Sequence, residues 1–355
     1  MLKEFIITGL LVIVLFSIAK IYLFIAKKAG IIDKPNERSS HINPVIRGAG
    51  IIFPVAWVMY AAVNGFILPW FTLAVIFIAA ISFTDDIKPL PARVRFLVHV
   101  ICFSLLFFQL GLFQRLPWWS LVAVYIICIG IVNAFNFMDG INGITGMYGL
   151  SFFVSLLVFR KALFPGMEPM TVLHDPVVYI LAALVVFGFY NFRKKAKCFA
   201  GDVGSVSIGF IVLFYCCVLI FGIDLRLAGS NEKGQMIPVH FHPGHIVFLA
   251  VYGVDSVLTI IHRLILKENI FKAHRRHLYQ YLCNEMKWPH ILVAAIYAIL
   301  QFGINFLFIE YELSFSMVLF IFLVLSMGYV LIKYLIISKL KLNSSSDRIP
   351  FRDNI

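Results

Sequence analysis

Long apolar segments alternate with short polar segments along almost the whole chain. A bilayer with a hydrocarbon core of about 30 Å is crossed by a helix of roughly 17 to 25 apolar residues, and most of these segments have that length. The pattern predicts about eleven transmembrane helices, near residues 5–26, 48–66, 67–83, 96–112, 119–137, 147–163, 177–190, 205–222, 244–261, 290–308 and 314–337. The segments 67–83 and 177–190 are short, so ten helices is the alternative. The predicted fold class is therefore an all-α, polytopic integral membrane protein.

The composition leads to the same class. The 355 residues are 61% hydrophobic and only 14% charged, and the mean hydropathy is +0.93. Soluble domains are about half apolar and a quarter charged. The first apolar segment is too long for a signal peptide, and Lys27 and Lys28 follow it as a stop signal. No loop has room for a soluble domain, so residues 1–337 are predicted to form one transmembrane domain, followed by a short cytoplasmic tail at 338–355.

The formal net charge of +12 is spread unevenly over the loops. If the N-terminus lies outside and every segment crosses, most of the 30 Lys and Arg residues fall in the inside loops, which are residues 27–47, 84–95, 133–146, 191–204, 262–289 and 338–355. This asymmetry follows the positive-inside rule, so these loops are predicted to face the cytoplasm. The charge suits an anionic lipid surface or an anionic substrate. Because the basic residues follow the membrane rather than one face of a soluble fold, no nucleic-acid partner is expected.

A polar, glycine-rich motif, NAFNFMDGINGITG at residues 133–146, separates two apolar segments. It places Asn133, Asn136, Asp139 and Asn142 among glycines. Polar groups at this density would go unsatisfied in lipid, and glycine lets the backbone offer its N–H groups to an anion. A carboxylate beside such a loop suits a metal that carries phosphates. A helix-ending turn is the simpler alternative, but three side-chain amides and an aspartate favour a site.

Further aspartates lie at or near the ends of apolar segments. Asp85 and Asp86 are adjacent, and a cation such as Mg²⁺ would relieve their repulsion; a surface helix cap is the alternative. Asp202 lies in the sequence GDVGS, where the N–H groups of a helix start come together with a carboxylate. Asp255 lies inside a segment, where a lone carboxylate is costly. We expect Asp255 to pair with a cation such as Arg263 or to hydrogen-bond a neighbouring helix.

Two inside loops carry cations that suit a phosphate group. The loop DKPNERSSHINPVIRGAG, residues 33–50, offers Lys34, Arg38, His41 and Arg47. The later loop carries the consecutive residues His274, Arg275, Arg276 and His277. A zinc site is not favoured there, because no cysteine or carboxylate nearby completes a ligand set. Simple anchoring of the inside face is the alternative for both loops, but it does not require the histidines.

Together, these loops place four aspartates and several cationic clusters on one membrane face. That arrangement indicates a divalent metal with a diphosphate substrate, for which phosphoryl transfer is the natural chemistry. Two other classes remain open. A secondary transporter of an anionic solute would also bury charges, although near the bilayer midplane rather than at one side. A non-catalytic assembly subunit that binds lipid phosphates would need the basic clusters but not the four aspartates.

With these motifs in this order over residues 33–280, the chain resembles the polyprenyl-phosphate N-acetylhexosamine-1-phosphate transferases (glycosyltransferase family 4), relatives of the phospho-MurNAc-pentapeptide translocase. The resemblance implies a ten- or eleven-helix protein of the bacterial inner membrane with a cytoplasmic active site. A homodimer is the expected assembly. It implies a UDP-N-acetylhexosamine donor, undecaprenyl phosphate as acceptor, and Mg²⁺, or alternatively Mn²⁺, as cofactor. The implied products are undecaprenyl-diphospho-sugar and UMP.

The resemblance also implies roles for residues that match its motifs. Asp85, Asp86 and Asp139 would be catalytic, and Asp202 and Asp86 would bind the metal. The implied substrate-binding residues are Lys34, Arg38, His41, Asn136, Asn142, Asn191, Lys197, Phe199, His274, Arg275, Arg276 and His277. The chain departs from the family where Asn142 replaces a frequent second Asp, and where Leu278 follows His277 in place of consecutive histidines. These departures suggest a branch that initiates surface polysaccharide, O-antigen or capsule synthesis rather than peptidoglycan synthesis.

Overall fold

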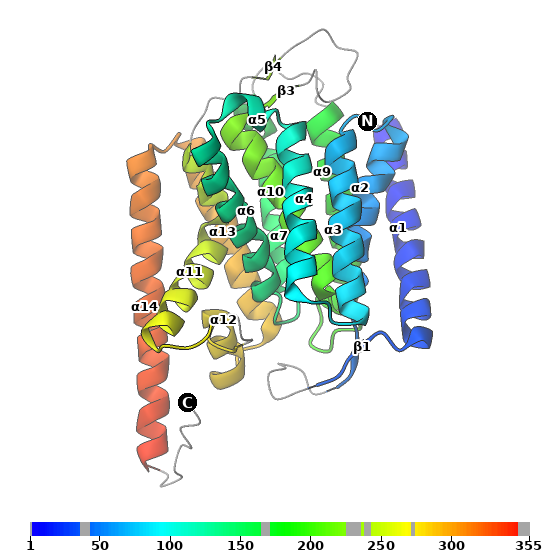
Figure 1. Cartoon of the computed structure of the whole chain (residues 1–355). Helices are drawn as coiled ribbons and strands as arrows, with labels where there is room; N and C mark the ends of the chain where they lie inside the picture. Colours follow the sequence, from blue (N-terminus) through cyan, green and yellow to red (C-terminus); the bar gives the residue numbers. More distant parts are fainter. Residues whose placement is uncertain are drawn as a thin grey trace.

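Long helices lying side by side make up the protein, as the computed structural model shows (Figure 1). The structure describes residues 2–35, 43–164, 171–224, 236–237, 243–270 and 274–346. The long helices are α1 (Leu2–Ala29), α2 (Ile52–Val63), α3 (Pro69–Ile87), α4 (Ala92–Gln109), α6 (Trp118–Met138), α7 (Ile144–Val158), α9 (Thr171–Asn191), α10 (Gly201–Phe221), α11 (Ala250–Ile265), α13 (His290–Glu310) and α14 (Phe315–Ser346). The short helical elements are η1 (Ala49–Ile51), α5 (Leu112–Arg115), α8 (Arg160–Leu163), η2 (Pro243–Leu249), α12 (Leu278–Gln280) and η3 (Tyr281–Glu285).

Two short antiparallel ribbons join the helices. The strand β1 (Ile32–Asp33) pairs with β2 (Val45–Ile46), with Ile32 opposite Ile46. The strand β3 (Ile223–Asp224) pairs with β4 (Met236–Ile237). The two ribbons lie at opposite ends of the helix bundle (Figure 1). The β1–β2 ribbon therefore shares its end with the loops between α3 and α4 and between α9 and α10.

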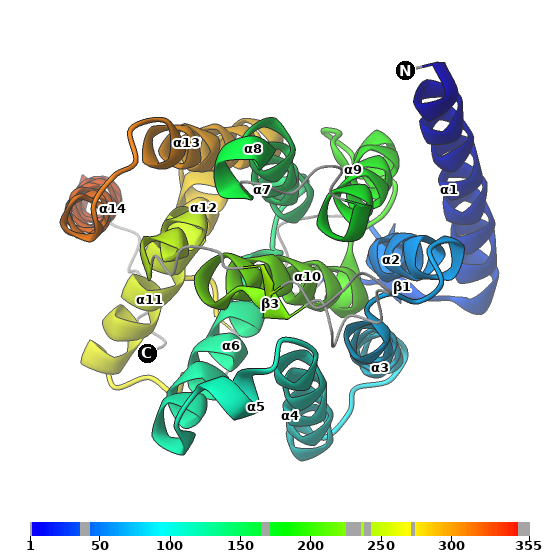
Figure 2. The same cartoon turned by 90° about the horizontal axis from the view of Figure 1, so that it is seen from above.

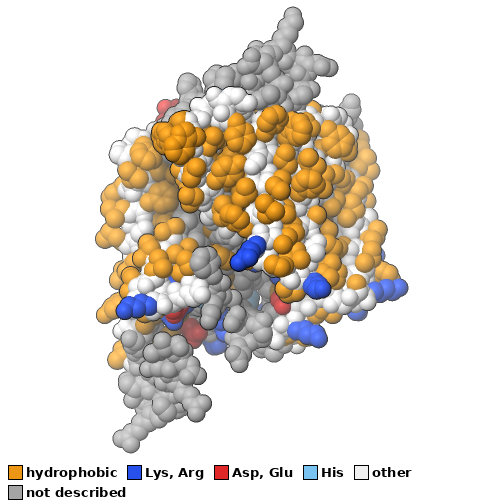
Figure 3. All heavy atoms as spheres, viewed as in Figure 1, with side chains coloured by type: hydrophobic (Ala, Val, Ile, Leu, Met, Phe, Trp, Pro, Cys, Tyr) orange, Lys and Arg blue, Asp and Glu red, His pale blue; other side chains and the backbone are white. Residues whose placement is uncertain are grey.

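The predicted all-α membrane class is confirmed. Within the described ranges, eight helices have at least 18 residues and are apolar enough to cross a membrane. Three shorter apolar helices cover residues 49–63, 144–158 and 176–191. Every predicted segment overlaps one of these helices. Large apolar side chains cover the outer surface of the bundle, where lipid would contact them (Figure 3).

Helix α10 lies in the middle of the bundle when it is seen from above (Figure 2). In its most apolar stretch, 94% of the residues are buried, compared with 22% for α1 and 11% for α14. Its first residue, Gly201, has a φ of +71°, which glycine adopts without strain. The central position of α10 fixes the place of Asp202, which lies in its first turn.

A buried glutamine stabilises the junction between η2 and α11. The side-chain oxygen of Gln301 accepts hydrogen bonds from the Tyr148 hydroxyl (2.7 Å) and the Val251 N–H (3.0 Å). Its amide nitrogen donates to the Val247 carbonyl (2.9 Å) and to the Asn305 side chain (2.7 Å). Because backbone groups without partners are costly in a membrane interior, Gln301 allows the change of helix type at this depth.

The polar loops gather at one end of the bundle, which we call the polar end (Figure 1). It comprises the β1–β2 ribbon, the α3–α4, α6–α7 and α9–α10 loops, and the segment around α12. Lys and Arg side chains concentrate toward this end in the space-filling view (Figure 3). The loops predicted from charge to lie on one face therefore lie together. That this face is cytoplasmic stays a prediction.

Candidate active site

The carboxylate of Asp86 joins the end of α3 to the start of α10. Its two oxygens accept hydrogen bonds from the N–H groups of Asp202 and Val203, both at 2.9 Å. These N–H groups have no partner within their own helix, so Asp86 caps α10 from another helix. A Cβ atom on Gly201 would lie 2.6 Å from Asp86 Oδ2. Glycine at position 201 therefore permits both the positive φ and the approach of the carboxylate.

The guanidinium of Arg47 connects two of the aspartates. Its Nε lies 2.6 Å from Asp86 Oδ1, and one terminal nitrogen lies 2.8 Å from Asp202 Oδ1. Burial lowers the pKa of Arg47, but the Asp202 and Asp86 charges outweigh this and raise it above its usual value. The Arg47 carbonyl accepts a hydrogen bond of 2.7 Å from the Tyr22 hydroxyl of α1. Arg47 is thus held as a permanent cation between Asp86 and Asp202.

Backbone pairing brings the Arg47 loop to the centre. The Phe199 N–H donates to the Ile46 carbonyl (2.8 Å), and the Gly50 N–H donates to the Ala200 carbonyl (3.0 Å). A Cβ atom on Gly204 would lie 2.7 Å from the Cα atom of Gly50, so both glycines are needed for this close approach. The RGAG and FAGDVGS motifs therefore pair through their backbones and pack directly against each other.

Asp85 belongs to the same cluster but has its own partners. Its Oδ1 accepts the Leu90 N–H at 2.6 Å, and its Oδ2 lies 2.8 Å from the Arg95 guanidinium. The Asp85 carboxylate also interacts electrostatically with Asp202. The paired aspartates thus divide their contacts: Asp86 binds α10 and Arg47, and Asp85 binds the α3–α4 loop and α4.

Asp139 completes the cluster from the end of α6. Its Oδ1 accepts a hydrogen bond of 2.7 Å from the Thr145 hydroxyl. Burial raises the pKa of Asp139 to about 7; the Thr145 hydrogen bond and the Arg47 charge lower it, while the nearby Asp202 and Asp86 charges raise it. Four aspartates from three helix ends therefore interact at the polar end, as the sequence motifs predict.

The raised pKa of Asp139 has a measurable consequence for stability. The native carboxyl binds its proton more tightly than the unfolded one, so wild type should lose stability, relative to Asp139→Asn, as the pH rises from 3.8 to about 7. Asparagine can still accept the Thr145 bond but does not titrate. Melting temperatures of both proteins in detergent, without metal or substrate, test this expectation. A difference between the two proteins that is constant over this range would contradict it.

The three predicted substrate-binding asparagines all form hydrogen bonds within the protein. Asn136 donates to the Ser205 hydroxyl (3.2 Å) and interacts with Asp202. Asn191 accepts the Gly143 N–H (2.7 Å) and donates to a backbone carbonyl, and Asn142 donates to the Arg193 carbonyl (3.1 Å). Asn191 and Asn142 hold the α6–α7 and α9–α10 loops together. Their contact with a nucleotide stays a prediction.

The first part of the motif at 133–146 is helical, in agreement with the predicted segment 119–137, although the whole motif is also counted among the inside loops. Helix α6 continues to Met138, so Asn133 and Asn136 lie on a helix rather than in a loop. The reason is local: Asn133 satisfies its side chain by donating to the Ile129 carbonyl one turn earlier (2.9 Å). The turn itself comprises residues 139–143, between α6 and α7.

The other described substrate-binding residues predicted in the loops 33–50 and 191–204 do not lie in the aspartate cluster. Lys34 and Lys197 are exposed, and Phe199 is partly exposed where the RGAG and FAGDVGS motifs pair. Arg38 and His41 lie outside the described residues. Lys34 and Lys197 thus lie at the rim of the polar end and are not part of the aspartate cluster. Their predicted roles stay predictions.

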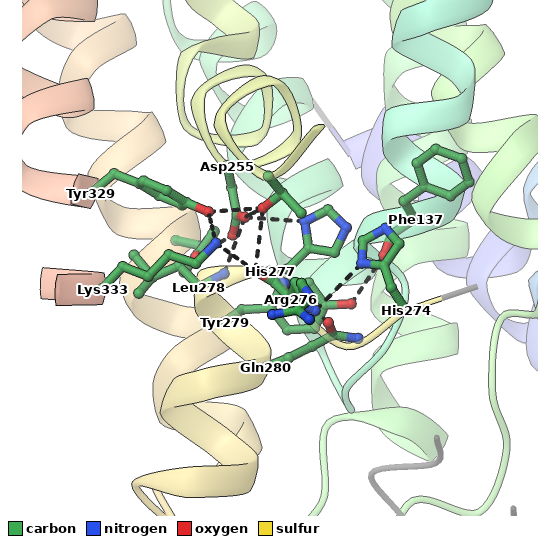
Figure 4. Close-up of polar contacts among 12 residues, drawn as sticks. Phe137, Asp255, His274, Arg276, His277, Leu278, Tyr279, Gln280, Tyr329 and Lys333 are labelled. Carbon is green, nitrogen blue, oxygen red and sulfur yellow. Dashed lines mark hydrogen bonds and ion pairs between the residues drawn. The ribbon is translucent and has the colours of Figure 1, made fainter. Parts of the chain in front are cut away.

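The basic segment His274–His277 lies beside the end of α6, and both His274 and the nearby Tyr279 contact Phe137 there (Figure 4). The Tyr279 hydroxyl donates to the Phe137 carbonyl at 3.0 Å, two residues before Asp139, and the His274 ring packs beside the Phe137 ring. Burial lowers the pKa of His274 to about 4, with help from the neighbouring His277 and Arg263. His274 is therefore a neutral hydrogen-bonding group at neutral pH rather than a cation.

Of the two alternatives expected for Asp255, pairing with Arg263 is not found among the contacts of the described residues. Oδ1 of Asp255 lies 3.1 Å from Nδ1 of His277 instead. Arg263 pairs with Glu268 at 3.1 Å, because the loop after α11 turns back over the helix end. His277 is only 2% exposed and is held inside the protein. The other alternative, a hydrogen bond to a neighbouring helix, is confirmed by the Tyr297 hydroxyl of α13 (2.7 Å).

The aspartate cluster fits a hard divalent cation, but not as a complete cage. Among the described residues, no three His, Cys, Asp or Glu side chains are arranged to hold a metal ion by themselves. Mg²⁺ needs only one or two carboxylates when substrate phosphates and water supply the other ligands. Asp202 and Asp86 already bind a cationic group, Arg47, through their oxygens. Their oxygen chemistry and mutual repulsion suit a metal that arrives with a diphosphate.

The site also contains residues outside the predicted catalytic and binding sets. Arg47 is predicted only as a loop cation, and its position directly before Gly48 is the available signal for a larger role. Tyr22 contacts the site from the apolar helix α1, where nothing in the sequence distinguishes it from the other aromatic residues. Tyr279 follows the basic segment by two residues, and this proximity is the available signal for its contact with the site.

Comparison with known proteins agrees with this geometry. The family model described as glycosyl transferase family 4 matches residues 68–220, a range that contains all four aspartates of the cluster. An undecaprenyl-phosphate alpha-N-acetylglucosaminyl 1-phosphate transferase of Thermotoga maritima is 23% identical, over 81% of this chain and 85% of its own length.

Two further relatives have related names. A decaprenyl-phosphate N-acetylglucosaminephosphotransferase of Mycobacterium leprae is 23% identical, over 73% of this chain and 71% of its own length. An undecaprenyl-phosphate alpha-N-acetylglucosaminyl 1-phosphate transferase of Escherichia coli is 27% identical, over 58% of this chain and 60% of its own length. The chain is thus similar to polyprenyl-phosphate N-acetylglucosamine-1-phosphate transferases, and these comparisons support a phosphotransferase.

Proposed function

We propose that this protein transfers an N-acetylhexosamine-1-phosphate from a UDP-sugar to undecaprenyl phosphate, as the initiating step of surface polysaccharide, O-antigen or capsule synthesis. The products are undecaprenyl-diphospho-sugar and UMP. The observation that carries the proposal is the meeting of Asp85, Asp86, Asp139 and Asp202 with Arg47 at the polar end of the bundle. N-acetylglucosamine is the first candidate sugar, because the relatives compared above carry it in their names.

The position of the cluster suits a lipid acceptor. The aspartates lie at the ends of α3, α6 and α10, at the polar end of the bundle, and apolar side chains cover the outer surface of the bundle (Figures 1 and 3). A polyprenyl phosphate could keep its chain among the apolar side chains while its phosphate reaches the cluster. The water-soluble donor would enter from the side of the polar loops. This arrangement supports an active site on the cytoplasmic side of a bacterial inner membrane.

In the proposed reaction, an oxygen of the lipid phosphate attacks the β-phosphorus of the donor. A new P–O bond forms there, the bond from this phosphorus to the bridging oxygen breaks, and UMP leaves with that oxygen. Mg²⁺ bound through Asp202 and Asp86 would supply positive charge to the diphosphate. Arg47 supplies a fixed cation at the same place. Asp139, with a pKa of about 7, can take the proton of the lipid phosphate.

The proposal is tested by measuring UMP release by purified protein with a panel of UDP-N-acetylhexosamines. We expect release that requires undecaprenyl phosphate and Mg²⁺, with Mn²⁺ as an alternative metal, and that favours one sugar. Release of UMP from donor alone would count against direct attack by the lipid and favour a covalent intermediate on an aspartate. Folded protein that releases no UMP from any donor would contradict the proposed function.

A further inference from the structure

Away from the aspartate cluster, a buried carboxylate on α11 holds the basic segment (Figure 4). Asp255 is 2% exposed. Its Oδ1 lies 3.1 Å from Nδ1 of His277 and accepts the Leu278 N–H at 3.1 Å, while its Oδ2 accepts the Tyr297 hydroxyl at 2.7 Å. A charged group at this depth is costly unless all its oxygens have partners, and Asp255 meets that condition.

A buried lysine on α14 holds a neighbouring residue of the same segment (Figure 4). Lys333 is 5% exposed, although α14 is otherwise the least buried of the long apolar helices. Its ammonium donates to the Arg276 carbonyl and to the Tyr329 hydroxyl, both at 2.7 Å. The Tyr329 hydroxyl also hydrogen-bonds Thr259 of α11 at 2.8 Å. An ammonium group placed in this way ties the last helix to the basic segment.

The two contacts act on consecutive residues. Lys333 binds the carbonyl of Arg276, and Asp255 binds the ring of His277 and the N–H of Leu278. Because Nδ1 of His277 is bound to Asp255, Nε2 is the ring nitrogen left for a ligand. This nitrogen is buried and has no hydrogen-bond partner within the described part of the chain. Buried polar atoms are rarely left in this state without a reason.

The surroundings of the segment carry excess positive charge. The described charged residues around it are Arg263, Arg275, Arg276 and Lys333, against Asp255 and Glu268. Glu268 binds the side chains of both Arg263 and Arg276. Among these described residues the cations outnumber the carboxylates, which suits an anionic ligand such as a diphosphate.

We propose that Asp255 and Lys333 form a clamp that positions the basic segment 274–277 against the end of α6, where it meets the diphosphate of the donor. This inference rests on the function proposed above. Both are positioning residues, because they act on the segment and do not touch the reacting atoms. The family model ends at residue 220, so neither residue lies in the range that it matches.

The clamp is tested by steady-state kinetics with Lys333→Met. We expect the KM for the UDP-sugar to rise roughly 10-fold, because a small displacement of a binding group is costly, while the KM for undecaprenyl phosphate stays unchanged. Asp255→Asn should show the same pattern. Tyr329→Phe removes one partner of Lys333 but keeps the ring, so a smaller rise in the same KM is expected. Lys339→Met on the exposed part of α14 is the matched control and should behave as wild type.

These results separate positioning from a general loss of structure. A merely structural role would lower the amount of active enzyme, and hence kcat, without changing either KM. Unchanged donor KM values in Lys333→Met, Asp255→Asn and Tyr329→Phe, in a wild type that releases UMP, would overturn the clamp alone. A folded wild type that releases no UMP would overturn the proposed function and the clamp with it. A donor KM for Lys333→Arg that lies between those of Lys333→Met and wild type would support the clamp further.

Discussion

Replacing Asp202 by Asn is expected to lower kcat/KM by roughly 10³-fold, because it removes the charge at the centre of the aspartate cluster. Asp202 pairs with Arg47 at 2.8 Å and interacts with Asp85 and Asn136. The asparagine has nearly the same shape, so α10 should keep its place while the site loses a carboxylate that can bind a metal. UMP release at a series of Mg²⁺ concentrations measures the effect.

The matched control for Asp202→Asn is Glu310→Gln at the exposed end of α13. It removes one acidic charge far along the chain from the cluster and should leave kcat/KM unchanged. The melting temperature of each variant shows whether the fold is retained. Activity of Asp202→Asn within about threefold of wild type, at any Mg²⁺ concentration, would mean that Asp202 is not a metal or charge centre of the reaction.

Replacing Arg47 by Met is expected to lower kcat/KM by roughly 10²-fold. The change removes the cation that lies 2.6 Å from Asp86 and 2.8 Å from Asp202, and leaves these carboxylates to repel each other. Arg47→Lys should recover only part of the activity, because a single ammonium cannot reproduce the two-sided contact of a guanidinium. The measurement is again UMP release with saturating lipid and varied donor.

Arg93→Met provides the comparison for Arg47→Met. Arg93 is exposed at the start of α4, at the same end of the bundle. Its removal changes the charge of the polar end by the same amount but does not touch the cluster. Equal activity of the Arg47 and Arg93 variants would show that general positive charge, rather than the contact with Asp86 and Asp202, explains the role of Arg47.

The helices could be predicted from the sequence because the membrane imposes a simple rule. A segment surrounded by lipid must be apolar and must satisfy its backbone within a helix, so composition and length suffice to find it. The grouping of Asp85, Asp86, Asp139 and Asp202 also follows, since each lies at a segment end on the predicted inside face. Exact helix ends did not always follow, since the segment predicted at 147–163 forms the helix Ile144–Val158 instead.

The partners of individual side chains could not be predicted, because they depend on contacts between distant parts of the chain. Arg47 reaches Asp202 only because residues 46–50 pair with 198–200, which no local pattern encodes. The sequence places Lys333 inside the apolar segment 314–337 and indicates no partner for it, yet its ammonium binds the Arg276 carbonyl. The packing of α11, α13 and α14 creates the environment of Asp255, and the sequence reveals only that such a carboxylate needs a partner.

The central claim is that the sugar and its phosphate move together onto a lipid phosphate. The most direct test uses a UDP-N-acetylglucosamine donor labelled both in the sugar and in the β-phosphate, with purified protein, undecaprenyl phosphate and Mg²⁺. We predict that both labels enter the lipid product in equal amounts, that UMP stays in the aqueous phase, and that Asp202→Asn transfers neither label. Transfer of the sugar label without the phosphate label would contradict the account, because it would mean glycosyl transfer rather than phosphosugar transfer.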